Sequence, residues 1–146
     1  MTEVLASKTC TPCRGGIPPL TGEEAELFHG QAPDWQLMEE AHRIERSFRF
    51  RNFRDALTFV QEIGELAEAE RHHPNISFGW GNATVSLQTK KIKGLHENDF
   101  IMATKIDRIF ARTAAGEASS TCPATCTAFS VPSAFFDVQQ TEAAMR

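Results

Sequence analysis

The most regular pattern in the chain is a helical recurrence of apolar residues between positions 53 and 67. The apolar face of this predicted helix consists of Phe53, Ala56, Leu57, Val60, Ile63, Gly64 and Ala67. Residues with this spacing lie on one side of an α-helix. Asn52 precedes them as the expected N-cap, with Asp55 in the first turn. Because Pro74 disfavours helical backbone at the residue before it, we expect the helix to end near Arg71.

Before this helix, residues 42–51 alternate between apolar and polar side chains. The apolar positions are Ile44, Phe48 and Phe50, with polar residues between them. This period indicates a strand with one face buried, although Arg46 interrupts the apolar row. A shorter strand is expected at residues 35–38, after a turn around Pro33.

The same alternation after the helix predicts a strand at residues 75–80. Its apolar positions are Ile76, Phe78 and Trp80. Gly81 and Asn82 tolerate the positive φ angles of a tight hairpin turn, so we expect the chain to return as a second strand. That return strand is expected to bury Val85 and Leu87.

Two further helices are predicted near the ends of the domain. One extends from an N-cap at Thr21 to about Gly30. The other begins near Glu97 and Asp99, two acidic residues suited to a helix N-terminus, and ends near Arg112. Its predicted apolar face consists of Met102, Ile106, Ile109 and Phe110.

The order of these elements is helix, two strands, helix, hairpin and helix. It predicts an α+β fold, with an antiparallel four-stranded sheet and helices packed on one face. We expect residues 21–112 to form one domain, preceded by a segment at 1–20 that contains a CxxC pair. Residues 113–146 are rich in Ala, Ser and Thr and lack a hydrophobic period, so a disordered tail is predicted there.

Composition and charge limit the classes of partner. The chain has 146 residues, of which 41% are hydrophobic and 23% charged, as expected for one soluble globular domain. A net charge of −4 argues against binding to nucleic acid or to an anionic membrane. No apolar run is long enough to span a bilayer, and residues 1–19 lack the pattern of a secretory signal. We therefore expect a cytoplasmic protein with no membrane partner.

The four cysteines form two close pairs, Cys10 with Cys13 and Cys122 with Cys126. A redox CxxC pair needs a strand-to-helix setting, and a structural zinc site needs four ligands. The first pair leads instead into a Gly- and Pro-rich stretch that is typical of a loop. We expect solvent-exposed reduced thiols, with a zinc site shared by the two pairs as the alternative.

The candidate chemistry lies at the predicted end of the central helix, where His72 and His73 precede Pro74. Imidazole titrates near neutral pH and suits proton transfer or binding of a polar ligand. The wider pattern resembles the signature of the pterin-4a-carbinolamine dehydratase family: an acidic residue, three spacers, His-His-Pro, an aromatic residue, then a histidine and an aspartate. The matching residues are Glu68, His72, His73, Pro74, Trp80 and Asp99. Lys90 stands where the family has its third histidine.

The resemblance implies an enzyme that dehydrates 4a-hydroxytetrahydrobiopterin to quinonoid dihydropterin and water, in the recycling of tetrahydrobiopterin. The 4a-hydroxyl leaves as water while N5 loses its proton, so one acid and one base suffice, and neither a metal ion nor a cofactor is expected. The resemblance assigns proton transfer to His72 and binding of the pterin to His73. It also implies a homodimer or homotetramer.

Three residues are candidates for substrate binding, and each also has a structural interpretation. Glu68 lies one helical turn before His72 and would orient its imidazole, or it is a solvated helix charge. Trp80 would present its ring to a flat heterocycle, but core packing explains its alternation slightly better. Asp99 would serve the site while it caps the last helix.

Lys90 is the third catalytic candidate. To act as a base at neutral pH, its amine would need a pKa about 3 units below the ordinary value of a lysine. A charged Lys90 would instead donate a hydrogen bond to the leaving oxygen, or it is a solvated charge beside Lys91 and Lys93. His96 is an alternative substitute for the missing histidine, although its position fits the turn into the last helix.

An alternative function belongs to a different class. Relatives of this fold act as binding partners of a homeodomain transcription factor or as RuBisCO assembly factors, and the loss of the third histidine fits a protein-binding member with little or no catalysis. The presence of Glu68, His72, His73 and Asp99 favours the enzyme.

Overall fold

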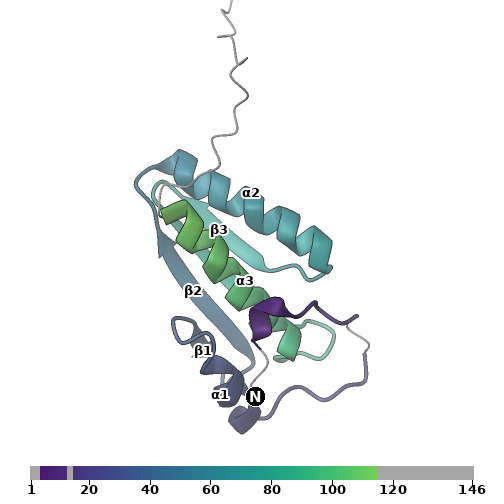
Figure 1. The fold of residues 1–146 in the computed structure, drawn as a ribbon. Helices are drawn as coiled ribbons and strands as arrows, with labels where there is room; N and C mark the ends of the chain where they lie inside the picture. The colour runs from purple at the N-terminus through teal and green to yellow at the C-terminus, as the bar shows by residue number, and fades with distance from the viewer. Residues whose placement is uncertain (1–3, 13–14, 115–146) are drawn as a thin grey trace, which may run out of the picture.

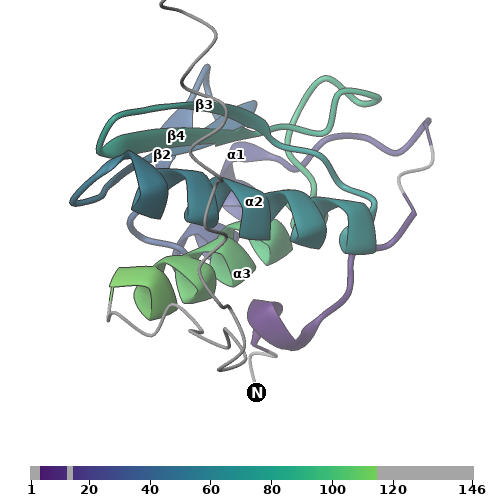
Figure 2. The same cartoon turned by 90° about the horizontal axis from the view of Figure 1, so that it is seen from above.

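Four antiparallel strands form one sheet in the computed structural model, which describes residues 4–12 and 15–114 (Figure 1). In chain order the elements are η1 (Leu5–Ser7), α1 (Gly22–His29), β1 (Gln36–Met38), β2 (Arg43–Arg49), α2 (Phe53–Glu70), β3 (Asn75–Gly79), β4 (Asn82–Leu87) and α3 (Glu97–Ala114). The strand order is β1-β2-β4-β3, and α2 and α3 cover one face of the sheet (Figure 2). The predicted α+β fold is confirmed.

The central helix α2 begins and ends where the sequence predicts. The side chain of Asn52 accepts a hydrogen bond from the backbone N–H of Asp55 at 2.8 Å and so caps the N-terminus. The last helical residue is Glu70, and Arg71 follows in the left-handed region with φ 54° and ψ 34°. This reversal directs the chain away from the helix axis into β3.

The last helix, α3, is longer than predicted, because it ends at Ala114 and not near Arg112. Thr113 therefore belongs to this helix, and the rest of the predicted tail, residues 115–146, lies outside the described residues. Within residues 4–12 and 15–114, no helix combines the length and the apolar character needed to cross a membrane.

The core lies between the sheet and the two long helices. The fully buried side chains of the two central strands include Ile44, Phe48, Val85 and Leu87. The rings of Phe48, Phe59 and Phe110, from β2, α2 and α3, pack with centroids 4.8 to 5.9 Å apart. These contacts join all three elements into one aromatic cluster.

Arg46 interrupts the apolar row of β2, yet it packs against the aromatic cluster. Its guanidinium carbon lies 4.8 Å from the ring centroid of Phe48 and 5.6 Å from that of Phe110. Nη1 donates a hydrogen bond to Asp107 Oδ1 at 2.6 Å, and Nη2 lies 3.1 Å from Asp34 Oδ2. Two carboxylates and two aromatic faces therefore compensate the half-buried charge.

Replacing Asp107 by Ala is expected to lower the free energy of unfolding by about 2 kcal/mol. Asp107 Oδ1 also accepts a hydrogen bond from Trp35 Nε1 at 2.9 Å, so the substitution deprives both an indole N–H and a guanidinium of an acceptor. Urea unfolding measures the change. Asp34→Ala is the control: the Asp34 side chain is 67% exposed, and its loss should cost under about 0.5 kcal/mol. Equal losses at both positions would contradict this account.

The N-terminal segment packs onto the helices. Leu5 is 1% exposed and belongs to the core, and its N–H donates to Gln31 Oε1 at 3.1 Å. Cys10 is half-buried, and its backbone N–H donates to Glu70 Oε2 at 2.8 Å. The expectation of a solvent-exposed thiol is therefore wrong for Cys10, because the ends of α2 and α3 cover it. The other cysteines, and with them the zinc alternative, lie outside the described residues.

Candidate active site

The end of α2 separates two histidines that are adjacent in the sequence. The left-handed conformation of Arg71 lets its own N–H and that of His72 both donate to the carbonyl of Ala67. The chain therefore turns sharply, so that the His72 side chain is 7% exposed and that of His73 is 62% exposed. One imidazole is thus placed in the interior and its neighbour on the surface.

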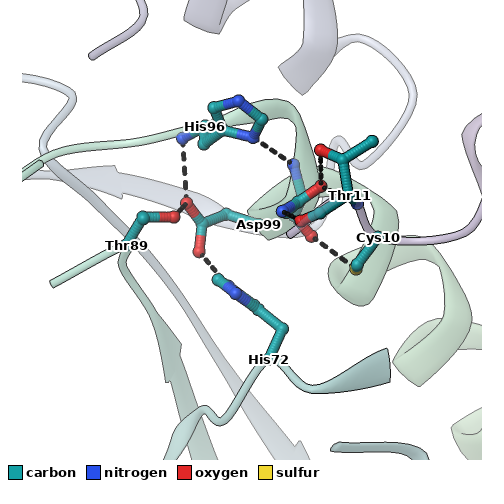
Figure 3. Close-up of polar contacts among 7 residues, drawn as sticks. Cys10, Thr11, His72, Thr89, His96 and Asp99 are labelled. Atoms are coloured by element: carbon teal, nitrogen blue, oxygen red, sulfur yellow. Dashed lines mark hydrogen bonds and ion pairs between the residues drawn. The ribbon is translucent and has the colours of Figure 1, made fainter. Parts of the chain in front are cut away.

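The buried imidazole is held by Asp99, which lies in the first turn of α3 and is fully buried (Figure 3). Asp99 Oδ1 lies 2.7 Å from His72 Nε2. Asp99 Oδ2 accepts hydrogen bonds from Thr89 Oγ1 at 2.8 Å and from the backbone N–H of His96 at 2.9 Å. A carboxylate that already accepts two such bonds is also an acceptor toward the ring, so His72 Nε2 donates. In neutral His72 the lone pair is then on Nδ1.

The exposed imidazole has a different carboxylate partner. His73 Nε2 lies 2.9 Å from Glu68 Oε1, and the Glu68 side chain is 79% exposed. The prediction that Glu68 orients His72 is therefore wrong. It assumed that the helical spacing continues through His72, whereas the turn at Arg71 brings His73 back beside Glu68.

Both histidines line a surface cleft of about 390 Å³. The described residues around it are Pro12, Arg71, His72, His73, Gln88, Thr89, Lys90 and Lys91. They come from the N-terminal segment, the end of α2 and the connection after β4. The cleft thus brings together all three predicted catalytic residues, with Lys90 exposed at its rim.

Trp80 lies away from this cleft. It is in the turn between β3 and β4, at the opposite end of β3 from His73, and it is 72% exposed. The interpretation of Trp80 as a core residue is wrong. β3 is an edge strand, and its Phe78 already packs against Phe53, the first residue of α2. The helix begins there, so it does not extend over Trp80. As a substrate-binding residue, Trp80 stays a prediction that the geometry of one chain does not support.

His96 serves the helix end, as its sequence position suggested. Its Nδ1 accepts a hydrogen bond from the backbone N–H of Asn98 at 3.2 Å, and it is not among the residues that line the cleft. Sequence reasoning missed Thr89, which orients Asp99 from the residue next to Lys90. Thr89 lies within a run of polar residues, Gln88 to Lys91, that follows a buried strand, so no signal in the sequence singled it out.

The arrangement suits proton transfer at one buried, oriented imidazole. The Asp99 carboxylate fixes the tautomer of His72 and would stabilise the imidazolium after His72 accepts a proton. Exposed Lys90 and the pair of His73 and Glu68 add hydrogen-bond donors and acceptors around the opening. In the described part of the chain, no group of three or more His, Cys, Asp or Glu side chains is placed to hold a metal ion.

Comparisons with known proteins point to one family. The profile of the family described as Pterin 4 alpha carbinolamine dehydratase matches residues 18–109. A protein of Cupriavidus pinatubonensis, provisionally named pterin-4-alpha-carbinolamine dehydratase 1, is 61% identical over 111 residues, which are 76% of this chain and 96% of that protein. A similarly named protein of an Azoarcus species is 60% identical over 109 residues, 75% of this chain and 93% of that one.

A solved structure has the same fold. The crystal structure described as a transcriptional coactivator/pterin dehydratase from Brucella melitensis aligns with a TM-score of 0.60 and 30% sequence identity. The alignment covers 63% of this chain and 98% of that one.

Proposed function

Since the chain belongs to the pterin 4 alpha carbinolamine dehydratase family, we propose that it dehydrates 4a-hydroxytetrahydrobiopterin and thereby serves the recycling of tetrahydrobiopterin. The observation that carries this proposal is the buried pair of His72 and Asp99 at the wall of a cleft, with Nε2 and Oδ1 separated by 2.7 Å. Such a pair supplies the single proton carrier that the reaction needs.

The reaction breaks the bond between C4a and the hydroxyl oxygen and removes the proton from N5. The electron pair of the N5–H bond forms the new C=N bond of the quinonoid product. The proton that N5 loses passes through His72 to the leaving hydroxyl, which departs as water. His72 takes the N5 proton at Nδ1, because Nε2 is engaged by Asp99. Asp99 stabilises the imidazolium that forms.

The rim of the cleft serves the substrate and the leaving group. His73, held by Glu68, binds and orients the pterin. Lys90 is exposed at the rim, and an ammonium group can only donate hydrogen bonds, so Lys90 supports the departing hydroxyl and does not act as the base. A histidine at this position, as in the family signature, can both donate and accept a proton, so we expect Lys90 to support a lower rate of dehydration.

Direct assay of the purified protein tests the proposal. A tetrahydropterin-dependent aromatic hydroxylase generates the 4a-hydroxy compound in situ, and the rise in absorbance of the quinonoid product gives the rate above spontaneous dehydration. The uncatalysed rate must be measured in the same buffer. A protein that does not increase this rate is not a dehydratase.

Replacing Lys90 by His is expected to raise the dehydration rate about tenfold or more, because it adds an acid-base group that functions near neutral pH. The matched variant is Lys91→His, which places the same imidazole on the adjacent lining residue and should change the rate by less than about twofold. Lys90→Ala separates the remaining roles. Little change on Lys90→Ala would identify the lysine as a solvated bystander, and a large loss with intact pterin binding would show that its ammonium assists the leaving oxygen.

A protein-binding role is the second candidate. A specific feature supports it: a groove of about 590 Å³ lies between the outer sides of α2 and α3, with Leu66 and Ile109 among its lining residues and Arg108 and Arg112 beside them. A groove with partly or fully buried apolar side chains at its base and charged side chains along its border is a feature of interaction sites. A wild-type protein that neither binds nor dehydrates any pterin would favour this role.

Location and assembly are further proposals. We place the activity in the cytoplasm, where a reduced pterin cofactor would be regenerated. We also propose a homodimer or homotetramer, because β1 and β3 are edge strands whose backbone groups can pair with another chain. Sedimentation of the purified protein tests the assembly.

A further inference from the structure

The cleft that contains the two histidines has one purely hydrocarbon side chain among its described lining residues, and that side chain is Pro12. The other described lining residues end in imidazole, hydroxyl, amide, ammonium or guanidinium groups. Pro12 is exposed, so its ring is available to a ligand. Pro12 also lies outside residues 18–109, the part of the chain that matches the family profile.

The segment that carries Pro12 is fixed to both helices beside the site. Asn98, which is 1% exposed, donates through Nδ2 to the carbonyl of Thr11 at 2.7 Å and accepts from the Thr11 N–H at 3.0 Å. Lys8 Nζ donates to Glu97 Oε1 at 2.7 Å. These contacts place residues 8–12 against the first turn of α3.

A second anchor ties the segment to α2. Glu70 Oε2 accepts from the backbone N–H of Cys10 at 2.8 Å, while Glu70 Oε1 pairs with Lys105. Burial raises the pKa of the Glu70 carboxyl, but the hydrogen bonds from Cys10 and Lys105 outweigh burial and hold this pKa below its ordinary value. Glu70 is therefore a charged acceptor at neutral pH. The segment has a defined position before any ligand binds.

We propose that Pro12, held by Thr11 and Asn98, is a substrate-binding residue that supplies the apolar wall of the pterin cleft. A pterin is a flat ring system with polar edges, and such a ligand needs apolar surface for its faces as well as hydrogen bonds for its edges. This inference rests on the proposed function, because it names the ligand of the same cleft. It assigns to the N-terminal segment a role in substrate affinity and none in proton transfer.

Asn98 is the positioning residue of this wall. It precedes Asp99 in the sequence, so one turn of α3 holds both the N-terminal segment and the catalytic imidazole. Loss of the Asn98 side chain would release Thr11 and with it Pro12, while the hydrogen bonds that Asp99 receives would persist.

The test compares Pro12→Ala with Pro18→Ala in the full chain. Pro18 is also an exposed proline of the N-terminal region, but it is not among the residues that line the cleft. Pro12→Ala is expected to raise KM for the 4a-hydroxypterin about threefold to tenfold, as expected for the loss of ring methylenes from a contact, with kcat within about twofold. Pro18→Ala should leave both constants unchanged. Asn98→Ala should raise KM at least as much as Pro12→Ala does.

A binding measurement separates this inference from the proposed function. Calorimetric titration with 7,8-dihydrobiopterin gives Kd without catalysis, and Pro12→Ala should weaken it by the same factor as KM. Unchanged KM and Kd in Pro12→Ala, or a loss confined to kcat, would overturn the inference while the dehydratase stands. If wild type binds the pterin but does not dehydrate it, the proposed function fails. The ratio of Kd between Pro12→Ala and wild type then tests by itself whether Pro12 forms the apolar wall of the cleft. A wild type that binds no pterin overturns both.

Discussion

Replacing His72 by Ala is expected to lower the rate of pterin-4a-carbinolamine dehydration about 10²- to 10⁴-fold, the usual contribution of a positioned proton carrier. The loss should appear in kcat, because His72 is the imidazole whose tautomer is fixed by a buried carboxylate. KM should change little, since the rim residues that bind the pterin remain. Steady-state kinetics with the enzymatically generated substrate measures both constants.

The control for this variant is His73→Ala, which removes the neighbouring but 62% exposed imidazole. It should raise KM more than it lowers kcat. His72→Ala also leaves Asp99 with one acceptor oxygen unused in the interior, so a stability loss of about 1–3 kcal/mol is expected. A circular dichroism spectrum at the assay temperature must therefore show a folded variant. A folded His72→Ala protein with wild-type kcat would refute the assignment of the base.

Replacing Asp99 by Asn is expected to lower kcat about 10²-fold or more by inverting the tautomer of His72. One oxygen of Asp99 faces the backbone N–H of His96, which can only donate. The amide oxygen of an asparagine must take this position, which turns its NH₂ group toward His72 Nε2. The imidazole would then accept at Nε2 and carry its proton on Nδ1, where it can no longer act as a base.

Asp99→Asn should bind 7,8-dihydrobiopterin with nearly wild-type affinity, because the shape of the cleft is kept. Nitrogen-15 chemical shifts of the His72 ring report the tautomer directly and should exchange their assignments between wild type and variant. Asp99→Ala distinguishes the effect of the His72 tautomer from an effect on folding. It leaves the donors of His72, Thr89 and His96 without their acceptor. We expect it to lower the free energy of unfolding by about 3 kcal/mol. Full activity in Asp99→Asn would show that this carboxylate has only a structural role.

The fold was predictable because local patterns and the global architecture agree. Asn52 and Pro74 delimit α2, and the alternation around Ile44 and Val85 identifies strands with one buried face. The sequence could not reveal how Arg46 is accommodated, because its partner Asp107 is 61 residues away. An ion pair between residues far apart in the sequence produces no periodic pattern along the chain.

The sequence predicted which three candidate catalytic residues lie close together, but it did not predict their carboxylate partners. His72, His73 and Lys90 meet in one cleft, as the family signature implied. The assignment of Glu68 to His72 failed, because it depended on one non-glycine residue, Arg71, in the left-handed region, which few sequence signals indicate. Trp80 failed for a related reason: an alternating pattern says which side of a strand a residue faces, not whether a helix extends far enough to cover it.

The N-terminal segment was the least predictable part. The Gly- and Pro-rich stretch that follows Cys10 is typical of a loop, yet before it Leu5 begins a short 3-10 helix and is buried, and Thr11 is anchored to Asn98. Its anchors are hydrogen bonds and an ion pair to residues far along the sequence, which composition and periodicity cannot show. The CxxC spacing raises the possibility of metal or redox chemistry at the thiols. The contact between Cys10 and Glu70, however, is made by the backbone N–H of Cys10.

The anchoring of this segment also bears on how the protein is made. During synthesis, Lys8 and Thr11 leave the ribosome well before their partners Glu97 and Asn98, which follow 89 and 87 residues later. Residues 8–11 must therefore wait for the start of α3 before they can dock. Until α3 has been made, the half-buried Cys10 lacks the cover that the start of α3 gives its thiol in the folded protein, and its sulfur is then more accessible to oxidants.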